Sequence, residues 1–180
     1  MHPSPRTHFI LAATLLLIAS GCQSKTKATP QNFITGLNAN FLTHSECLFP
    51  EAPRFPVGTS DKVEIKQFDA LVKATLLSVA QEPAIKVNRY TVTPIGARYA
   101  PRFCYGHRTV TAIESFTPPA QANGFPETHV TYRYSMLDVP VWAKTPEVQA
   151  AFPAMARATA GESTGQAVLA GTLAGWQVPE

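Results

Sequence analysis

Apolar residues recur at three- and four-residue spacing near the middle of the chain and predict one well-defined helix. The helix is expected to begin at Thr59 or Ser60 as its N-cap and to end before Pro83. Its apolar stripe consists of Ile65, Phe68, Leu71, Val72, Leu76 and Val79. A membrane or partner helix would have a similar pattern, but a stripe of this width is more typical of a helix packed on a sheet.

Three later segments predict strands, at residues 84–93, 103–116 and 128–137, the first of which is rich in β-branched residues and bounded by Pro83 and Pro94. The third alternates most clearly: one face carries Val130, Tyr132, Tyr134 and Met136, and the other carries His129, Thr131, Arg133 and Ser135. In the first, the alternation changes phase between Val87 and Tyr90, which predicts a bulge. Residues 117–127 contain three prolines and Asn123-Gly124, and predict a long hairpin loop rather than a tight turn.

Weaker patterns flank these elements. Residues 32–42 predict a short helix weakened by Gly36, and the proline-rich residues 47–60 predict an irregular segment. Thr145-Pro146 is typical of a helix start, and Pro153 then predicts either a kink or two short helices. Residues 166–178 predict a last strand, whose two glycines would permit a helix to pack closely.

This order of elements predicts an α+β fold, with an antiparallel sheet of about four strands and helices packed on one face. A curved sheet around a helix, as in cystatin-like or nuclear-transport-factor-like proteins, is one architecture compatible with the order. That comparison concerns topology alone and implies no function.

The N-terminal residues have the pattern of an export signal. Arg6 precedes an uncharged, almost wholly apolar run that ends in small residues and Cys22. A membrane-spanning helix would need about 20 apolar residues, and polar residues follow this shorter run at once. We therefore do not expect a retained transmembrane anchor. A plain signal peptide with an incidental cysteine is the alternative to the interpretation that follows.

Ala19-Ser20-Gly21-Cys22 resembles the lipobox of bacterial lipoproteins, with Ala19 where leucine is usual. The resemblance covers residues 1–22 only. It implies that Cys22 becomes a diacylglyceryl thioether and the first residue of the mature protein. A lipoprotein carries two or three acyl chains, which suffice for stable attachment. Gln23 after the cysteine, in place of aspartate, implies sorting to the outer membrane, with the domain in the periplasm or exposed at the surface.

Three parts are therefore expected: a signal peptide at 1–21, the lipidated cysteine with a flexible tether at 22–31, and a single α+β domain at 32–180. At 3.3–3.6 Å per residue, the tether would hold the domain at most about 30 Å from the bilayer.

The charge of the chain argues against nucleic acid as a partner. Removing residues 1–21 takes away Arg6 and no acidic residue, so 15 basic and 12 acidic side chains become 14 and 12. No run of basic residues accompanies this near-neutral balance.

Two of the three cysteines remain once Cys22 is assigned to lipid. Cys47 and Cys104 have no Cys-x-x-Cys spacing, and an exported chain folds where disulfides persist. We expect a structural disulfide between them, against the alternative of one buried and one free thiol.

No residue is predicted to be catalytic. In Cys104-Tyr-Gly-His107 a thiol and a base are close in sequence, but three residues apart on a strand they point to opposite faces, and a disulfide would consume the thiol. No motif predicts a cofactor, and two histidines without a third ligand do not predict a metal site.

A polar strip is the best candidate for binding. It would form if His107 on one strand and His129 and Arg133 on the next faced the same side of the sheet; a solvated face is the alternative. Trp142 is either a partner anchor or part of the core.

We expect a lipid-anchored cell-envelope protein that acts by binding or structural association with an envelope protein or glycan. One alternative is a small periplasmic inhibitor of a lytic enzyme, with residues 117–127 as the contacting loop. A less favoured one is an envelope enzyme.

Overall fold

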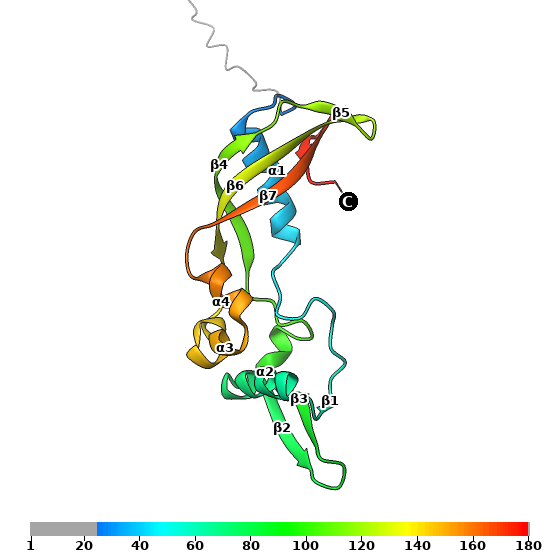
Figure 1. Ribbon diagram of the computed structural model, residues 1–180, viewed down its shortest axis with the longest axis vertical. Helices are drawn as coiled ribbons and strands as arrows, with labels where there is room; N and C mark the ends of the chain where they lie inside the picture. Colours follow the sequence, from blue (N-terminus) through cyan, green and yellow to red (C-terminus); the bar gives the residue numbers. More distant parts are fainter. Residues whose placement is uncertain (1–24, 180) are drawn as a thin grey trace, which may run out of the picture.

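Two antiparallel sheets, one of five strands and one of three, lie toward opposite ends of an elongated molecule (Figure 1). The structure is a computed structural model and describes residues 25–179. The predicted signal peptide and Cys22 lie outside the described residues. Helices accompany both sheets, so the predicted α+β class with helices packed on a sheet is confirmed, although the strands divide between two sheets instead of forming one.

The sheet lobe contains the five-stranded sheet and one helix. Its elements are α1 (Pro30–Thr43), β4 (His107–Phe116), β5 (Ala120–Ala122), β6 (Phe125–Leu137), β7 (Ser163–Thr172) and β8 (Gly175–Gln177). The strands run in the order β4-β6-β7-β8, and β5 pairs with the beginning of β6, residues 125–127. Apolar residues of α1 pack against one face of the sheet and form a core of Phe33, Leu37, Val110, Val130, Tyr132, Tyr134, Leu169 and Trp176.

Gly36 allows α1 to lie directly on β8. A Cβ atom at this position would be 2.0 Å from the backbone oxygen of Trp176, closer than any side chain can approach. The sequence pattern had assigned this role to the glycines of the last strand. Instead, Gly171 lies beside Pro126 and the Trp176 ring, and Gly175 adopts a φ of +117° at the start of β8. The helix therefore supplies the glycine that permits the close approach.

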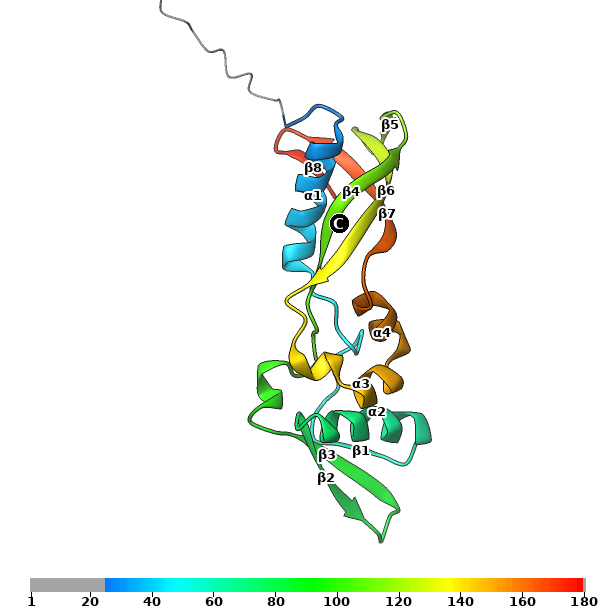
Figure 2. The same cartoon turned by 90° about the vertical axis from the view of Figure 1, so that its left-hand side faces the viewer.

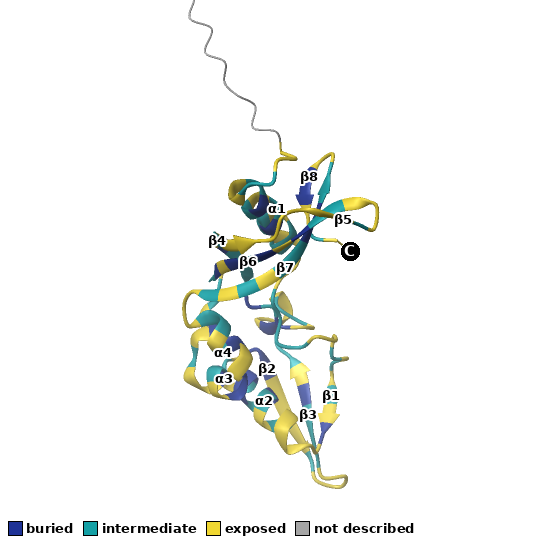
Figure 3. Cartoon of the chain, turned by 45° about the horizontal axis from the view of Figure 1, so that its top comes forward, coloured by how far each residue is buried: buried dark blue, intermediate teal, exposed yellow. Residues whose placement is uncertain are grey.

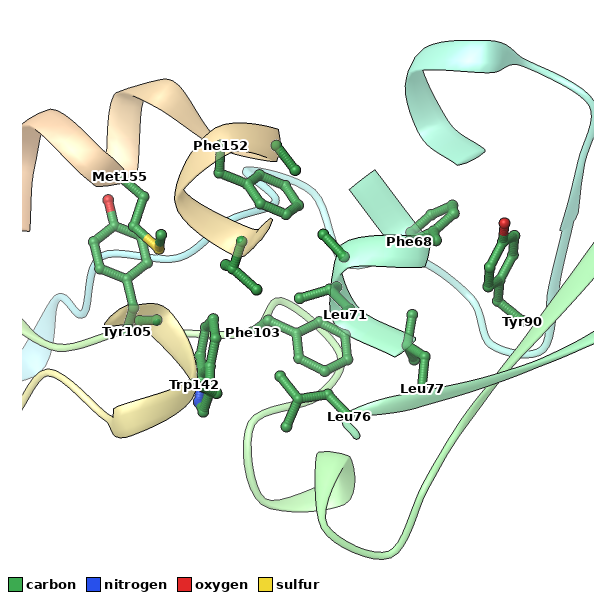
Figure 4. Packing of buried hydrophobic residues seen from close by; sticks show 14 residues of the cluster. Phe68, Leu71, Leu76, Leu77, Tyr90, Phe103, Tyr105, Trp142, Phe152 and Met155 are labelled. Carbon is green, nitrogen blue, oxygen red and sulfur yellow. The ribbon is translucent and has the colours of Figure 1, made fainter. Parts of the chain in front are cut away.

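The helical lobe contains the smaller sheet and the remaining helices. Its elements are β1 (Val57–Thr59), α2 (Lys62–Lys73), β2 (Leu77–Glu82), β3 (Val87–Val92), η1 (Gly96–Arg98), η2 (Val141–Lys144), α3 (Pro146–Ala151) and α4 (Pro153–Thr159). Figure 4 shows its core, in which Phe68, Leu71 and Leu76 from the α2 region lie near Phe103, Trp142 and Phe152. Two short helices meet at Phe152, as the position of Pro153 had suggested.

The predicted central helix is too long by about two turns. Asp61 is its N-cap and accepts hydrogen bonds from the amides of Val63 and Glu64, but α2 ends at Lys73. Thr75 then adopts a φ of +63°, which turns the chain into β2. The residues after this turn pair with β3 from Leu77 to Glu82. Strand pairing therefore decides the structure of a segment whose apolar spacing also suits a helix.

Three strand predictions are corrected by the pairing. The register of β2 with β3 is continuous, so the bulge predicted between Val87 and Tyr90 is absent, and the irregularities fall in β4 instead. Residues 117–127 contain a tight turn: Asn123 and Gly124 both have positive φ and connect β5 to β6, the conformation that favours a two-residue hairpin. The last predicted strand is a hairpin of β7 and β8.

The lobes are built from interleaved pieces of the chain. The described chain passes between them four times, at residues 44–56, 99–106, 138–140 and 160–162 (Figures 1 and 2). The first two crossings run antiparallel and form what we call the waist, residues 46–49 and 102–106. Backbone hydrogen bonds of 2.8 Å join Glu46 to Gly106 and to Tyr105 across it. The predicted Cys47–Cys104 disulfide is present within this ladder.

Removing the disulfide should lower stability strongly. For a sequence separation of 57 residues, the chain-entropy model predicts that the Cys47→Ser/Cys104→Ser variant loses about 4 kcal/mol in its free energy of unfolding. Urea denaturation of this variant, and of the reduced native protein as a control, measures the loss. A loss below about 1 kcal/mol would contradict the view that this bond limits the freedom of the unfolded chain.

Candidate functional site

One face of the five-stranded sheet is left uncovered by α1, and β6 supplies its centre. The even-numbered residues from Val130 to Tyr134 point into the core, so His129, Thr131 and Arg133 point the other way. Figure 3 shows buried and exposed residues alternating along β6. We call this surface the open face. Its polar residues on β6 are the ones that the alternation of the sequence had placed together.

Neighbouring strands extend the open face on both sides. Val168, Gln166 and Thr164 of β7 lie opposite His129, Thr131 and Arg133 in register, and Ser115 of β4 lies opposite Thr131. A hollow of 450 Å³ lies around His129, bordered by Ser115, Phe116, Thr117, Thr131, Gln166 and Val168. We call it the His129 hollow. Its lining combines the His129 imidazole, the hydroxyls of Ser115, Thr117 and Thr131 and the Gln166 amide with apolar surface from Phe116 and Val168, so it offers hydrogen-bonding groups beside apolar contacts.

The wall of the His129 hollow is fixed by Thr117 and Thr128. The backbone amide of Thr117 donates to the carbonyl of His129 at 3.0 Å, and the amide of His129 donates to the Thr117 hydroxyl at 3.0 Å. The buried Thr128 hydroxyl donates to the Thr117 carbonyl at 2.6 Å. The backbone on this side of His129 is therefore ordered, and a ligand would meet a preformed surface.

Arg133 lies between two carboxylates on the open face. Its Nη1 donates to Glu162 at 3.0 Å, and its Nε lies 3.5 Å from Glu114. The Thr111 hydroxyl donates to the other oxygen of Glu162 at 2.7 Å. Two irregularities in the pairing of β4 with β6, at Thr111 and Glu114, bring these residues to Arg133. The cluster carries one positive and two negative charges, so it is an acidic and not a basic patch.

His107 belongs to the same face but not to the same site. It pairs with Leu137, eight residues along β6 from His129, which separates the two histidines by about 26 Å. Its side chain is 14 % exposed, and its Nδ1 lies 3.6 Å from the carboxylate of Asp138. The predicted strip therefore keeps His129 and Arg133 together and leaves His107 near the waist.

Trp142 lies in the core of the helical lobe. It is 7 % exposed and packs edge-on against Tyr99, with ring centroids 5.5 Å apart. Figure 4 shows it beside Phe103 and Tyr105. Of the two roles expected for Trp142, the structure therefore shows the core residue and not an exposed partner anchor.

The described residues contain no group of three His, Cys, Asp or Glu side chains placed to hold a metal ion. Cys104 is bonded to Cys47, so its thiol is unavailable to act with His107 as a nucleophile. Within residues 25–179, no helix has the length and apolar character needed to cross a membrane.

A second concave region was not predicted from the sequence. A groove of 1120 Å³ runs along α1, between this helix, the β7–β8 hairpin and the C-terminal residues 177–179. Small residues of α1, among them Thr35, Gly36 and Ala39, form its floor. Because the other wall comes from β8 more than 130 residues later, no local pattern in the sequence indicates the groove.

Arg108, the second arginine on the sheet, is a structural residue. Its Nε lies 2.6 Å from Glu46, an ion pair by distance although Nε lacks hydrogen-bond geometry. Its guanidinium lies over the Tyr134 ring at 4.8 Å and the Phe41 ring at 5.6 Å. Burial opposes its charge, but the Tyr132 hydroxyl and the Glu46 carboxylate outweigh burial, so the pKa of Arg108 is raised above its ordinary value. Arg108 thus connects the waist to the sheet lobe.

Comparison of the chain with protein-family models, with curated proteins and with solved structures finds no match. The assignment of the site therefore depends on the geometry and on the N-terminal pattern.

The two arginines of the sheet should differ in their contribution to stability. Arg108→Ala should cost about 2 kcal/mol, because it leaves the half-buried Glu46 carboxylate unpaired and removes the ring contacts. Arg133→Ala, in an exposed cluster, should cost less than about 1 kcal/mol. Urea denaturation of both variants measures the difference, and equal losses would contradict the separation of a structural from a surface arginine.

Proposed function

We propose that this chain is a lipid-anchored protein of the bacterial cell envelope, attached through Cys22, whose domain acts by binding or structural association. Its attachment is to the outer membrane, as Gln23 after the lipidated cysteine implies. The partner that meets the open face is an envelope protein or glycan.

The allocation of the cysteines supports the anchor. The disulfide uses Cys47 and Cys104, the two cysteines of the described domain, and disulfides of this kind persist in exported proteins. The third cysteine, Cys22, is the one that ends the lipobox-like sequence. A disulfide between Cys47 and Cys104 and a lipid on Cys22 are both expected of a protein exported to the cell envelope. The disulfide, which leaves Cys22 as the remaining cysteine, is the observation that carries the proposal.

The open face supports the binding role. It presents His129 and Arg133 on β6, which pairs with β4 and β7, and Gln166 on β7, which pairs with β6 at this position, and the hollow beside His129 is already formed. A rigid, concave surface favours association because little conformational freedom is lost on binding.

Lipid attachment is tested by growing cells with radiolabelled palmitate. The native chain should incorporate the label and remain with the membranes, and Cys22→Ser should lose both properties, because the thioether sulfur is absent. Cys47→Ser/Cys104→Ser serves as the control and should keep the label. An unlabelled native chain that is nevertheless exported would remove the anchor.

The binding role is tested by photocrosslinking in intact cells. A photoreactive amino acid at Gln166, exposed on the open face, should form a covalent adduct that a matched position, Thr91 on the exposed side of β3, does not form. His129→Ala should lower the adduct yield several-fold because His129 borders the hollow. Equal yields at both positions, or none at Gln166, would argue against the open face as the binding surface.

A further inference from the structure

The first residues that the structure describes, from Lys25 to Thr29, pack against β8 and the start of α1. The carbonyl of Lys27 accepts a hydrogen bond from the Trp176 indole at 3.0 Å and another from the side-chain amide of Asn32 at 2.9 Å. Thr29 caps α1, which begins at Pro30. A Cβ atom at Gly175 would lie 3.4 Å from the carbonyl oxygen of Lys25. The part of the expected tether from Lys25 onward is thus packed on β8.

The remaining distance between Cys22 and the domain is short. Gln23 and Ser24 are the residues between Cys22 and Lys25, and three residue steps span at most about 10 Å. A domain attached through lipid on Cys22 therefore lies within about 10 Å of the bilayer surface, and not within the 30 Å that a free tether at 22–31 would allow. The end of the sheet lobe near Lys25 is the end that faces the membrane.

This end carries a leucine that is wholly exposed. Leu173 lies in the turn between β7 and β8 and is 100 % exposed. The turn is ordered, since the Thr172 hydroxyl accepts from the Ala174 amide at 3.2 Å and donates to the Gly175 carbonyl at 2.8 Å. Turns ordinarily have polar residues or glycine at their tips. Leu173 is therefore displayed by a defined turn beside the start of the described chain.

Charged and aromatic side chains accompany Leu173. Lys25 and Lys27 are exposed beside the turn, and Phe125, which is 48 % exposed, borders the same groove as Lys25 and Ala174. In Figures 1 and 2, the β5–β6 hairpin and the β7–β8 hairpin both lie at the end where α1 begins, far from the helical lobe. Apolar tips flanked by lysines are the composition that suits the interface of a bilayer containing anionic lipids.

We propose that the turn at Leu173 is a membrane-contact site, which inserts Leu173 into the bilayer interface and places Lys25 and Lys27 at the lipid phosphates. The proposal rests on the proposed function, because the lipid on Cys22 brings this end to the membrane. The contact orients the domain: the long axis stands away from the bilayer, and the helical lobe is the part farthest from it.

The test uses the full lipidated protein in vesicles of phosphatidylethanolamine and phosphatidylglycerol. The thioether and the disulfide leave no free thiol, so Leu173→Cys carries a single environment-sensitive fluorophore. Val141→Cys is the matched control, because Val141 is 82 % exposed and lies in the helical lobe. The label at 173 should show a blue-shifted emission and at least about a two-fold stronger quenching by spin-labelled lipids than the label at 141.

The outcomes separate the two proposals. Protein that carries no acyl chains and does not float with vesicles contradicts the anchor at Cys22. Protein that floats, but whose label at 173 is quenched no more than the label at 141, overturns the membrane contact and leaves the anchor intact. A label at 173 shielded from iodide in water and also unquenched by spin-labelled lipids would mean that a second copy of the chain covers Leu173, which also overturns the membrane contact.

Discussion

The pairing of residues 46–49 with 102–106, closed by the Cys47–Cys104 disulfide, is the constraint on which the two-lobed shape depends. The chain enters the helical lobe through the first segment and returns to the sheet lobe through the second. The strands of the sheet lobe and the helices of the other lobe each come from separate pieces of sequence. Neither lobe can therefore complete its core until the chain has crossed the waist several times, which makes the contacts of both lobes largely non-local.

The waist also explains how the two arginines of the sheet divide their roles. Arg108 follows the waist directly and meets Glu46, which precedes Cys47, so its charge is neutralised inside the junction of the lobes. Arg133 lies farther along the sheet, and its carboxylate partners are exposed side chains of β4 and of the segment before β7. A bound molecule could replace the exposed carboxylates beside Arg133 at small cost in free energy. Replacing Glu46 beside Arg108 would instead disturb the connection between the lobes. The ion pairs of the open face are therefore easier to exchange than the one at the waist, which agrees with the open face as the proposed binding surface.

The sequence predicted features that depend on neighbouring residues and failed where distant segments decide. The alternation along 128–137 placed His129 and Arg133 together, and Pro153 indicated two short helices, because both patterns are local. The spacing of Leu76 and Val79 continued the helical pattern, but the chain leaves the helix before Leu76, and pairing with β3 places Val79 in a strand. The separation of His107 from His129 depends on register, and the groove along α1 depends on β8. Neither follows from any local period.

The position of the open face relative to the chain start has a consequence for any partner. The strands of the sheet lobe run from the end near Lys25 toward the waist, so the open face lies along the side of the molecule (Figures 1 and 2). The proposed anchor at Cys22, together with the proposed membrane contact at Leu173, would place that side along the membrane normal, where bulky envelope components could reach it without passing beneath the domain. A long flexible tether would instead let the face turn in any direction and would increase the orientational freedom lost on binding. The packing of Lys27 against Trp176 is thus the contact through which an anchor at one end would set the direction of binding at the side.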